Sequence, residues 1–372
     1  MIKVLHVLPT RASEYGGPVA VAEEMARELT VQGVKTSIFP PDIGTYPKHK
    51  YRKKFMGIKA EVSKYDLIHI HCLWNFSSSV AVFLARKAGV PYVITPHGML
   101  DRWALKKGRW KKFFFSIFFE KKNLSGSSGV HFLNNEELFE AKDFDINLTP
   151  FVLPNGVRKN QESNPSSRAE LEKYYPQFKD KVLPLFMGRL HPKKGIDLLL
   201  VAFSEAVKIV PNMHLIIAGP DENGYKSSLE RIIDTYKLSQ YVTFMGMVEG
   251  RRKFDVLNAA DFFVLPSHQE GDSMAIKEAM AAYLPVIITP ACHFPDVMRY
   301  NLGRVIEPDI LLLTQALVDF SLSPEDRDLM GKNAYRIVNH QYIWPKIVER
   351  LLHIYKDILN KSKTSIDWKV ES

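Results

Sequence analysis

Short apolar segments recur along the chain, and between them the apolar residues fall at helical spacing. Six such segments lie in the first half: IKVLHVLP (2–9), VKTSIF (34–39), DLIHIH (66–71), PYVITPH (91–97), GVHFLN (129–134) and FVLPNGV (151–157). Six more lie in the second half: KVLPLFMG (181–188), HLIIAG (214–219), YVTFMG (241–246), DFFVLPS (261–267), PVIITP (285–290) and GRVIEP (303–308). Near-continuous apolar strands that alternate with helices are typical of parallel sheets covered on both faces. The two sets therefore predict an α/β protein of two doubly wound, Rossmann-like domains.

A polar stretch separates the two sets of strands. Residues 154–167, PNGVRKNQESNPSS, are rich in Asn, Ser and Pro, which is typical of a linker. We expect a first domain over residues 1–157, a second over 158–343, and a last helix over 344–372 that crosses back to the first domain. Ligands of doubly wound sheets bind at the carboxyl ends of the strands, so the cleft between the two sheets is the expected site.

The composition indicates a folded protein from a reducing compartment. The length of 372 residues suits two domains, and the apolar share of 46% is enough to bury their cores. The richest apolar run, FFFSIFF at 113–119, is far shorter than the ~18 residues that span a bilayer. The N-terminus lacks the features of a signal peptide, and two cysteines cannot build a disulfide framework. We therefore expect a cytoplasmic protein.

The net charge of +9 is concentrated in the first half of the chain. Residues 1–155 hold 22 Lys/Arg against 14 Asp/Glu, whereas the remainder holds 28 against 27. Within the first half, residues 101–122 hold eight Lys/Arg and two acids among aromatic residues at helical spacing, and KHKYRKK (48–54) adds further cations. This excess predicts an anionic partner. We expect peripheral attachment to an anionic membrane surface, with direct binding of a phosphorylated acceptor as the alternative.

Two loops that follow strands carry residues suited to a diphosphate. After the first strand, Gly16 and Gly17 permit a tight turn into a helix, whose first N–H groups can meet an anion. In the second half, GRLHPKKG places Arg189 and Lys194 just beyond a strand, where two cations can stabilise a departing diphosphate. Taken alone, the first feature also fits an ordinary strand-to-helix turn, and the second also fits solvated loop cations.

Two glutamates flank a turn in HQEGDSMAIKEAMA, residues 268–281. Glu270 lies in the predicted loop, beside residues 271–273, whose backbone N–H groups are expected to form a cup. Glu278 lies in the predicted helix near its positive N-terminal end, where a carboxylate can accept hydrogen bonds from a diol. This arrangement predicts that one carboxylate serves the sugar of a ligand and the other its ribose.

These segments resemble the retaining GT-B glycosyltransferases of family GT4, also called group 1. The motifs occur in the family's order over nearly the whole chain: the Gly-Gly loop, TPHGML, PNGV, GRLHPKKG, IIAGP, VTFMG and SHQEGDSMAIKEAMAAYLPVI. The resemblance implies an acceptor-side first domain that faces a nucleotide-sugar-binding second domain across a cleft. It also implies a hexosyltransferase that moves a sugar from a nucleotide sugar to a hydroxyl of a glycan or polyprenyl-linked acceptor. Such a retaining, metal-independent enzyme would serve surface polysaccharide or glycoconjugate biosynthesis.

The same resemblance assigns roles to individual residues. The catalytic residues would be His97, which faces the transferred sugar, and Glu270, which contacts the donor sugar. The donor-binding residues would be Gly16, Gly17, Arg189, Lys194, Gly246, Asp272, Ser273, Met274 and Glu278. Within that set, Arg189 and Lys194 would bind the diphosphate and Glu278 the ribose, and the backbone near Gly246 would meet the base. No metal and no other cofactor is implied.

Three positions depart from the family's pattern. Gly-Asp-Ser follows Glu270 where Gly-Phe-Gly is usual, which leaves the identity of the sugar open. Tyr283 stands where a glycine is usual, and we interpret it as a change of packing on the far side of the helix. Asp296 stands where Glu is usual.

Other classes of protein share some of these sequence features. An NAD-dependent oxidoreductase has the same fold class, but no G-x-G-x-x-G follows a strand here. The D-x-D pattern at 143–145 is similar to the metal site of the other large glycosyltransferase fold, but it lies in a polar segment and is not expected to bind metal. A GT-B nucleotide-sugar epimerase and a non-catalytic basic binding protein remain as alternatives. No nucleic-acid partner is expected.

Overall fold

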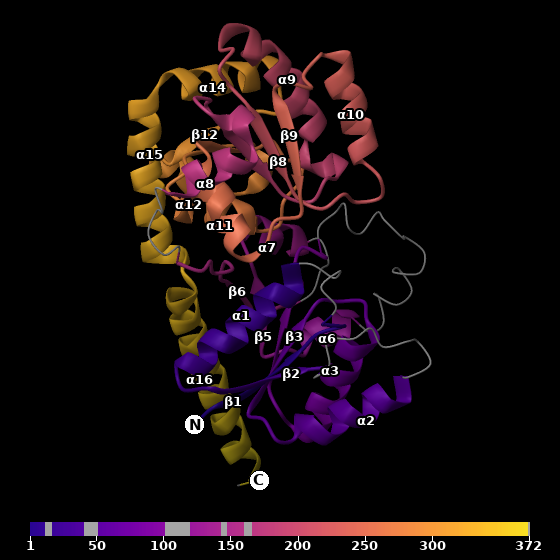
Figure 1. The fold of residues 1–372 in the computed structure, drawn as a ribbon. Helices are drawn as coiled ribbons and strands as arrows, with labels where there is room; N and C mark the ends of the chain where they lie inside the picture. Colours follow the sequence, from indigo (N-terminus) through magenta and orange to yellow (C-terminus); the bar gives the residue numbers. More distant parts are fainter. Residues whose placement is uncertain (12–16, 41–50, 101–119, 143–146, 160–165, 371–372) are drawn as a thin grey trace. The chain divides into compact units, whose positions relative to one another are not determined.

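The fold was analysed in a computed structural model of the chain. The structure describes residues 1–11, 17–40, 51–100, 120–142, 147–159 and 166–370, with the backbone alone for 51–55, 166 and 363–370. The described chain forms two compact units (Figure 1). The first unit contains Met1–Gly156 and Trp344–Ser372, and the second contains Val157–Ile343.

The first unit is built on a six-stranded parallel sheet with the order β2-β1-β3-β4-β5-β6. Its strands are β1 (Lys3–Val7), β2 (Lys35–Phe39), β3 (Leu67–His71), β4 (Tyr92–Thr95), β5 (Gly129–Phe132) and β6 (Pro150–Val152). All residues of β3 and β4 are buried, as expected of central strands covered on both faces. The six predicted strands of the first half are therefore confirmed.

Helices cover both faces of this sheet (Figure 1). They are α1 (Gly17–Val31), α2 (Tyr51–Val62), α3 (Phe76–Ala88), α6 (Lys121–Ser125), α7 (Asn135–Ala141) and α16 (Trp344–Val370). Apolar residues of α1 and α16 share one core with Val4 and Leu67 of the sheet. Residues of α2 and α3 share another core with Leu5 and Val7, whose side chains alternate with that of Val4 along β1. The predicted doubly wound architecture is thus present in this unit.

The last helix, α16, returns to the first unit. Its side chains Trp344, Leu351 and Tyr355 are buried in the core that it shares with α1. A Cβ on Gly156 would come within 2.5 Å of the Trp344 ring, so only glycine fits where the chain leaves the sheet of this unit. The predicted helix over 344–372 and the observed one begin at the same residue.

The second unit repeats the architecture with a six-stranded parallel sheet of order β12-β11-β10-β7-β8-β9. Its strands are β7 (Pro184–Met187), β8 (Leu215–Ala218), β9 (Val242–Gly246), β10 (Phe262–Leu265), β11 (Val286–Ile288) and β12 (Gly303–Val305). Its α-helices are α8 (Ser166–Tyr174), α9 (Ile196–Ile209), α10 (Lys226–Thr235), α11 (Gly250–Ala259), α12 (Met274–Ala281), α13 (Asp296–Arg299), α14 (Ile310–Leu322) and α15 (Pro324–Ile337). Short helices η5 (Pro176–Phe178), η6 (Pro192–Lys194), η7 (Pro290–Cys292) and η8 (Val338–Tyr342) connect them. The second predicted set of strands is confirmed as well.

Within the described residues, no helix is both long and apolar enough to cross a membrane. The two cysteines, Cys72 and Cys292, are buried as free thiols.

Candidate active site

The loop between β7 and α9 carries Lys194 at the end of the short helix η6. Gly195 follows with φ 66°, and a Cβ there would lie 2.1 Å from the carbonyl oxygen of Pro266. The loop after β10 therefore passes too close to Gly195 for any side chain, and this close approach fixes the position of Lys194. The close packing brings the two loops that follow β7 and β10 together at one edge of the sheet.

Glu270 lies in the loop after β10 and is held by three hydrogen bonds. Its Oε1 accepts from Lys194 Nζ at 2.6 Å and from the Ser267 hydroxyl at 2.5 Å, and its backbone N–H donates to the carbonyl of Ala291 at 3.0 Å. Its side chain is 8% exposed and that of Lys194 is 19% exposed. The structure thus brings together two predicted site residues, Lys194 and Glu270, as a largely buried ion pair.

Arg189 lies on the same loop as Lys194, but it pairs with a different acid. Its Nη1 donates to Glu222 Oε2 at 2.9 Å, and the side chain is 64% exposed. An exposed ion pair of this kind contributes little to stability, so the guanidinium can exchange its partner for an anion at small cost. The exposed position is compatible with the predicted contact to a diphosphate.

The N-terminus of α12 follows the loop that carries Glu270. The helix begins at Met274, and Ser273 before it makes no side-chain cap. The first N–H groups of a helix have no acceptor within the helix, and together with the helix dipole they favour an anion. Asp272 forms an ion pair with the fully buried Lys277 of the same helix, and this pair holds the turn that leads into it.

Glu278 lies on the second turn of α12, as predicted, and is paired across to α11. Its Oε1 accepts from Lys253 Nζ at 2.5 Å, and both side chains are about a quarter exposed, at 22% for Glu278 and 29% for Lys253. Lys253 takes one oxygen of the carboxylate, and a carboxylate has a second oxygen that can accept a hydrogen bond from a hydroxyl.

Gly246, the residue predicted to lie near the base, ends β9 with φ 66°. Its carbonyl accepts from the N–H of Gly219 at 2.7 Å. A Cβ on Gly219, at φ 145°, would lie 1.8 Å from the carbonyl oxygen of Gly188. The ends of β7, β8 and β9 therefore approach one another through the backbone of Gly188, Gly219 and Gly246.

Two predicted residues of the first unit are described. Gly17 is the first residue of α1, and a Cβ on it would meet no described heavy atom within 4 Å. His97 follows β4 with φ 55°, and its Nε2 lies 3.0 Å from Nδ1 of His71. Burial lowers the pKa of His97 to about 3, so the ring is neutral at pH 7. Gly16, the aromatic and basic segment at 101–119 and the D-x-D pattern at 143–145 lie outside the described residues.

Several partners of the predicted residues escaped the sequence analysis. Lys253 and Glu222 pair with predicted site residues but belong to no motif, whereas Ser267 begins the motif that contains Glu270 but was given no role. The spacing of Lys253 and Glu222 from their partners carries no signal, because each reaches its partner across the fold, whereas Ser267 lies three residues before Glu270 in the same loop. Lys277 carried a weak signal, since a lysine inside the apolar face of MAIKEAMA needs a buried counter-charge.

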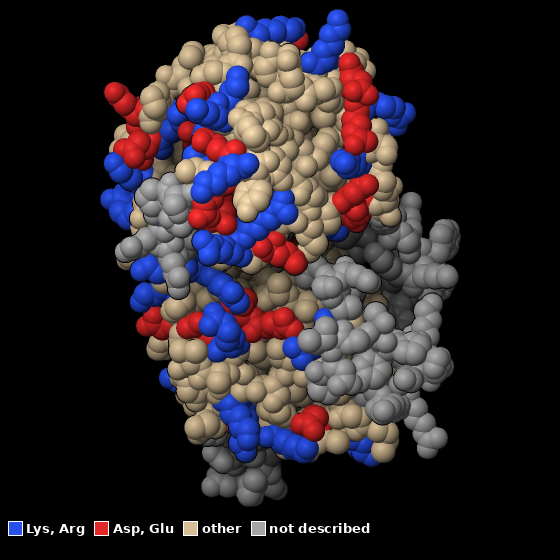
Figure 2. All heavy atoms as spheres, viewed as in Figure 1, with Lys and Arg blue, Asp and Glu red and all other residues tan. Residues whose placement is uncertain are grey.

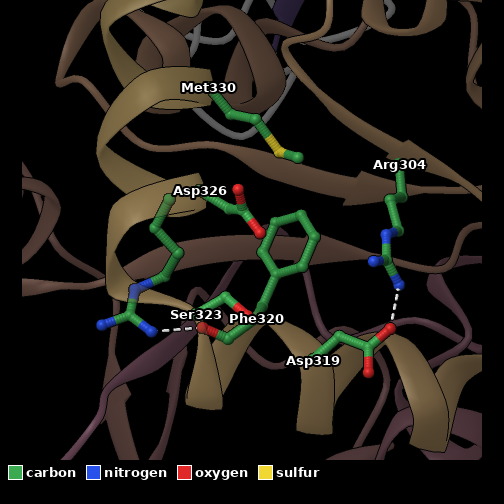
Figure 3. A pocket seen from close by; sticks show the side chains of 7 residues that line it. Arg304, Asp319, Phe320, Ser323, Asp326 and Met330 are labelled. Carbon is green, nitrogen blue, oxygen red and sulfur yellow. Dashed lines mark hydrogen bonds and ion pairs between the residues drawn. The ribbon is translucent and has the colours of Figure 1, made fainter.

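A small pocket in the second unit lies apart from these residues (Figure 3). It is lined by Arg304, Asp319, Phe320, Ser323, Asp326, Arg327 and Met330. Its cations are already engaged, because Arg304 pairs with Asp319 and Arg327 donates to the carbonyl of Phe320. None of the predicted site residues lines it.

Comparison with known proteins places this geometry in a class. Two family models match the chain: the glycosyl transferases group 1 model at residues 167–337 and the glycosyl transferase 4-like domain model at residues 55–156. A solved structure of Anabaena HepE in complex with UDP-glucose superposes with a TM-score of 0.77 at 16% identity, and covers 96% of this chain and 100% of that one. The fold is therefore GT-B, the two-domain glycosyltransferase architecture.

Curated relatives agree with the family models. A Bacillus subtilis glycosyltransferase, provisionally assigned to teichuronic acid biosynthesis, is 28% identical over 81% of this chain and 72% of its own length. A D-inositol 3-phosphate glycosyltransferase of Saccharomonospora viridis is 26% identical over 94% of this chain and 84% of its own length. This chain belongs to the group 1 glycosyltransferases.

Proposed function

We propose that this enzyme transfers a sugar from a nucleotide sugar to a hydroxyl of a glycan or polyprenyl-linked acceptor, with retention at the anomeric carbon. In the reaction, the bond from the anomeric carbon to the diphosphate breaks and a bond to the acceptor oxygen forms. The nucleoside diphosphate leaves with the negative charge that develops, and its leaving oxygen takes up the proton that the acceptor hydroxyl loses. Positioning and stabilisation of that charge supply most of the rate, so the protein needs no strong nucleophile.

The observation that carries the proposal is the arrangement around the N-terminus of α12. The uncapped helix end, the Lys194–Glu270 pair and the exposed Arg189 lie on neighbouring loops of one sheet edge. This set combines two cations and the first N–H groups of α12 for a diphosphate with a carboxylate for sugar hydroxyls. Glu278, one helical turn further along, is the carboxylate proposed to bind the ribose.

The surface charge of the second unit supports a local and not a general attraction for anions. On the face drawn in Figure 2, Lys and Arg are interspersed with Asp and Glu over this unit. The charge balance of residues 156–372 is close to neutral, with 28 basic against 27 acidic residues. Binding of a diphosphate therefore has to come from the placed groups named above and not from a broad basic surface.

In the first unit, we propose that His97 donates a hydrogen bond to the transferred sugar and that Gly17 lets backbone approach the diphosphate. The neutral state of His97 suits a hydrogen-bond donor better than a general acid, because its pKa of about 3 lies far below the operating pH. The empty space around a Cβ on Gly17 means that no described protein group requires glycine there, whereas a closely approaching ligand would.

We also propose that the transfer needs no metal ion. Arg189, Lys194 and the helix N-terminus offer the positive charge that a divalent cation would otherwise supply to the leaving group. Activity is then expected to survive treatment with EDTA. Loss of activity that Mg²⁺ or Mn²⁺ restores would contradict this part of the proposal.

A thermal-shift screen tests the donor class. The purified enzyme is heated with UDP-glucose, UDP-N-acetylglucosamine, GDP-mannose and ADP-glucose, and the same screen is run on Lys194→Ala. A ligand at ~100 times its dissociation constant stabilises the folded protein by about 2.7 kcal/mol. Nucleotide sugars with one of the three bases should therefore raise the melting temperature of the native enzyme and not that of the variant. No shift with any nucleotide sugar would contradict donor binding. Conversion of a bound nucleotide sugar to its epimer without an acceptor would identify an epimerase instead.

We further propose that the first unit attaches to anionic membrane surfaces through residues 101–122 and 48–54. Each cation near an anionic leaflet contributes ~1 kcal/mol, which is enough for reversible attachment by half a dozen. The enzyme should sediment with phosphatidylglycerol vesicles at low salt, less so at high salt, and not when Lys106, Lys107, Lys111 and Lys112 are changed to Glu. Absence of sedimentation at low salt would favour a soluble acceptor.

A further inference from the structure

Buried histidines line the α16-facing side of the first sheet behind His97. His6 of β1, His69 and His71 of β3 and His131 of β5 are all fully buried. The ring centroids of His71 lie 5.3 Å from those of both His6 and His97, with the planes inclined by 22° and 24°. Burial lowers the pKa of His6 to about 3 and that of His69 and His71 well below the usual value, so the rings are neutral.

One chain of hydrogen bonds through these rings has a fixed direction. His131 Nε2 lies 2.6 Å from the carbonyl oxygen of Leu153, which can only accept, so His131 is protonated at Nε2. Its Nδ1 then accepts from Thr95, whose oxygen in turn accepts from His69 Nε2 at 2.6 Å. The Tyr355 hydroxyl, 2.5 Å from His69 Nδ1, completes the chain as a donor. Every proton is assigned because one end is a carbonyl.

The second chain, His6–His71–His97, lacks such an anchor. His6 Nδ1 lies 3.0 Å from His71 Nε2, and His71 Nδ1 lies 3.0 Å from His97 Nε2. The inner end, His6 Nε2, is buried and has no hydrogen-bond partner among the described residues. Two neutral arrangements satisfy both contacts. Either every proton points outward and His97 carries Nδ1–H, or every proton points inward and His6 carries a buried Nε2–H.

The inner end decides between the two arrangements. The inward arrangement buries an N–H donor without an acceptor, whereas the outward arrangement leaves only a buried lone pair, the less unusual of the two defects. We propose that His71 and His6 are positioning residues that hold His97 in its Nδ1–H tautomer, so that it presents a hydrogen-bond donor on its outer edge. That this N–H donates to the donor sugar rests on the function proposed above, whereas the assignment of the tautomer does not.

A metal ion is the competing explanation for the same cluster. One ligand atom from each of His6, His69 and His71 lies within 4.8 Å of the other two, so the three rings are close enough to be considered. Both ring nitrogens of His69, however, belong to the chain anchored at Leu153. Nδ1 of His6 and Nε2 of His71 already share one proton. A metal would break these bonds and place a dication among neutral groups, so the hydrogen-bonded chain is favoured.

Two nearly isosteric variants of His71 should orient the hydrogen bonds of the second chain, His6–His71–His97, in opposite directions. In His71→Asn the amide N–H takes the place of Nδ1–H and still donates to His97 Nε2. In His71→Asp the carboxylate can only accept, which forces the proton of His97 onto Nε2 and leaves Nδ1 as an acceptor. The carboxylate also raises the pKa of His97, so at lower pH the ring becomes doubly protonated and regains Nδ1–H. The titratable groups that face this position are His6, His69, His97 and His131.

The test measures tautomers and turnover together. Ring ¹⁵N shifts of histidine-labelled enzyme should show His97 as Nδ1–H in the native protein and in His71→Asn, and as Nε2–H in His71→Asp at pH 7.5. Release of nucleoside diphosphate from the nucleotide sugar that binds best should fall about tenfold in His71→Asp at pH 7.5 and recover as the pH is lowered. In His71→Asn the rate should stay within about threefold and keep the native pH profile.

Tyr355→Phe is the matched control, because it removes one buried hydrogen bond from the chain that ends at the Leu153 carbonyl and none from the second chain, His6–His71–His97. It should lower the melting temperature without changing the His97 tautomer or the pH profile. An Nε2–H tautomer of His97 in the native enzyme overturns the proposal, as does stoichiometric metal that is lost in His6→Leu. Equal loss of activity in both His71 variants, with no recovery at low pH, also overturns it. The tautomers are read without substrate, so a failure of the proposed transfer reaction would leave this assignment standing or falling by itself.

Discussion

The buried ion pair before α12 leads to a prediction about stability. Lys277 is fully buried and pairs with Asp272, which is 6% exposed. The ammonium also lies 5.5 Å from the ring centroid of Tyr342, whose hydroxyl donates to Asp296 at 2.8 Å. Burial lowers the pKa of Lys277, while Asp272 opposes that shift, so the carboxylate is what keeps the ammonium charged inside the protein. Lys277→Met keeps most of the volume and removes the charge.

The expected loss is large because the remaining charge stays buried. Breaking a buried ion pair from one side typically costs 3–5 kcal/mol, whereas removing both charges is often close to neutral. We therefore expect Lys277→Met and Asp272→Asn each to destabilise the second unit by roughly 3–5 kcal/mol, and the double variant to lose less than the sum of the two. For a unit of this size the single changes should lower its melting temperature by roughly 6–20 °C.

Urea unfolding can follow the two units separately. All five tryptophans lie in the sequence of the first unit, so tryptophan fluorescence reports on that unit, whereas far-UV circular dichroism reports on both. Lys332→Met is the matched control, because Lys332 forms an ion pair with Asp328 on α15 with both side chains about two-thirds exposed, at 66% and 63%. This control should cost less than ~1 kcal/mol.

Two outcomes would refute the reasoning about this pair. One is a loss in Lys277→Met no larger than that in Lys332→Met, which would mean that the buried charge is not sustained by Asp272. The other is a double variant whose loss equals the sum of the single losses, which would mean that the two charges do not interact.

Three further predictions concern other residues. Gly17→Ala should leave the melting temperature unchanged, because the added Cβ meets no described atom. The same change should weaken binding of the nucleoside diphosphate in calorimetry, and unchanged binding would count against the assigned role. Tyr283 has φ 63°, and its ring stacks on that of Tyr335 with the centroids 3.9 Å apart. Both Tyr283→Ala and Tyr283→Gly lose the stacking, but only glycine relieves the left-handed backbone, so the Ala variant should be less stable by ~1 kcal/mol. A Gly variant that unfolds at lower urea than the Ala variant would refute this. The pKa of His6 is about 3 when folded, below the 6.5 of the unfolded chain, so the folded state binds fewer protons and stability is lost as the pH falls below 6.5. At pH 5.5 each buried histidine with such a lowered pKa should reduce the free energy of unfolding by ~1.4 kcal/mol. A free energy of unfolding that stays constant from pH 7.5 to 5.5 would contradict this.

The strands and their order along the chain were predictable because each is a short apolar run with its own local pattern. All twelve predicted strands are present. Local pattern gives no information on which strands are neighbours in a sheet. That β3 lies between β1 and β4, and that β10 lies between β11 and β7, depends on crossovers that the sequence does not encode locally.

The site was predictable only as far as its motifs reach. Glu270, Lys194 and Glu278 lie where their loops and helix were expected, because glycines and strand ends fix those loops. The partner of each charge was not predictable. Lys253 of α11 reaches Glu278 of α12 across the fold, and the spacing of 25 residues between them has no periodic meaning.

Tyr283 shows how a departure from a motif can be accommodated. It was interpreted as a packing change, and the structure gives the physical form of that change. The backbone keeps the left-handed conformation in which glycine is usual, and stacking on Tyr335 offsets the strain.

The central claim is that the second unit binds a nucleotide sugar through two carboxylates with separate tasks. It is tested most directly by steady-state kinetics of Glu270→Gln and Glu278→Gln with the nucleotide sugar that stabilises the enzyme. Glu278→Gln should raise the donor KM about tenfold with little change in kcat, because it loses a charge-assisted hydrogen bond to the ribose in ground and transition states alike. Glu270→Gln should lower kcat about tenfold or more with a smaller change in KM, because it lies beside the reacting sugar.

Melting temperatures of the two variants separate function from support of the fold, since Lys253 and Lys194 each lose the charge of a partner. The account predicts that the kinetic constants change in this divided way while both variants remain folded at the assay temperature. A native donor KM in Glu278→Gln together with native turnover in Glu270→Gln would contradict it.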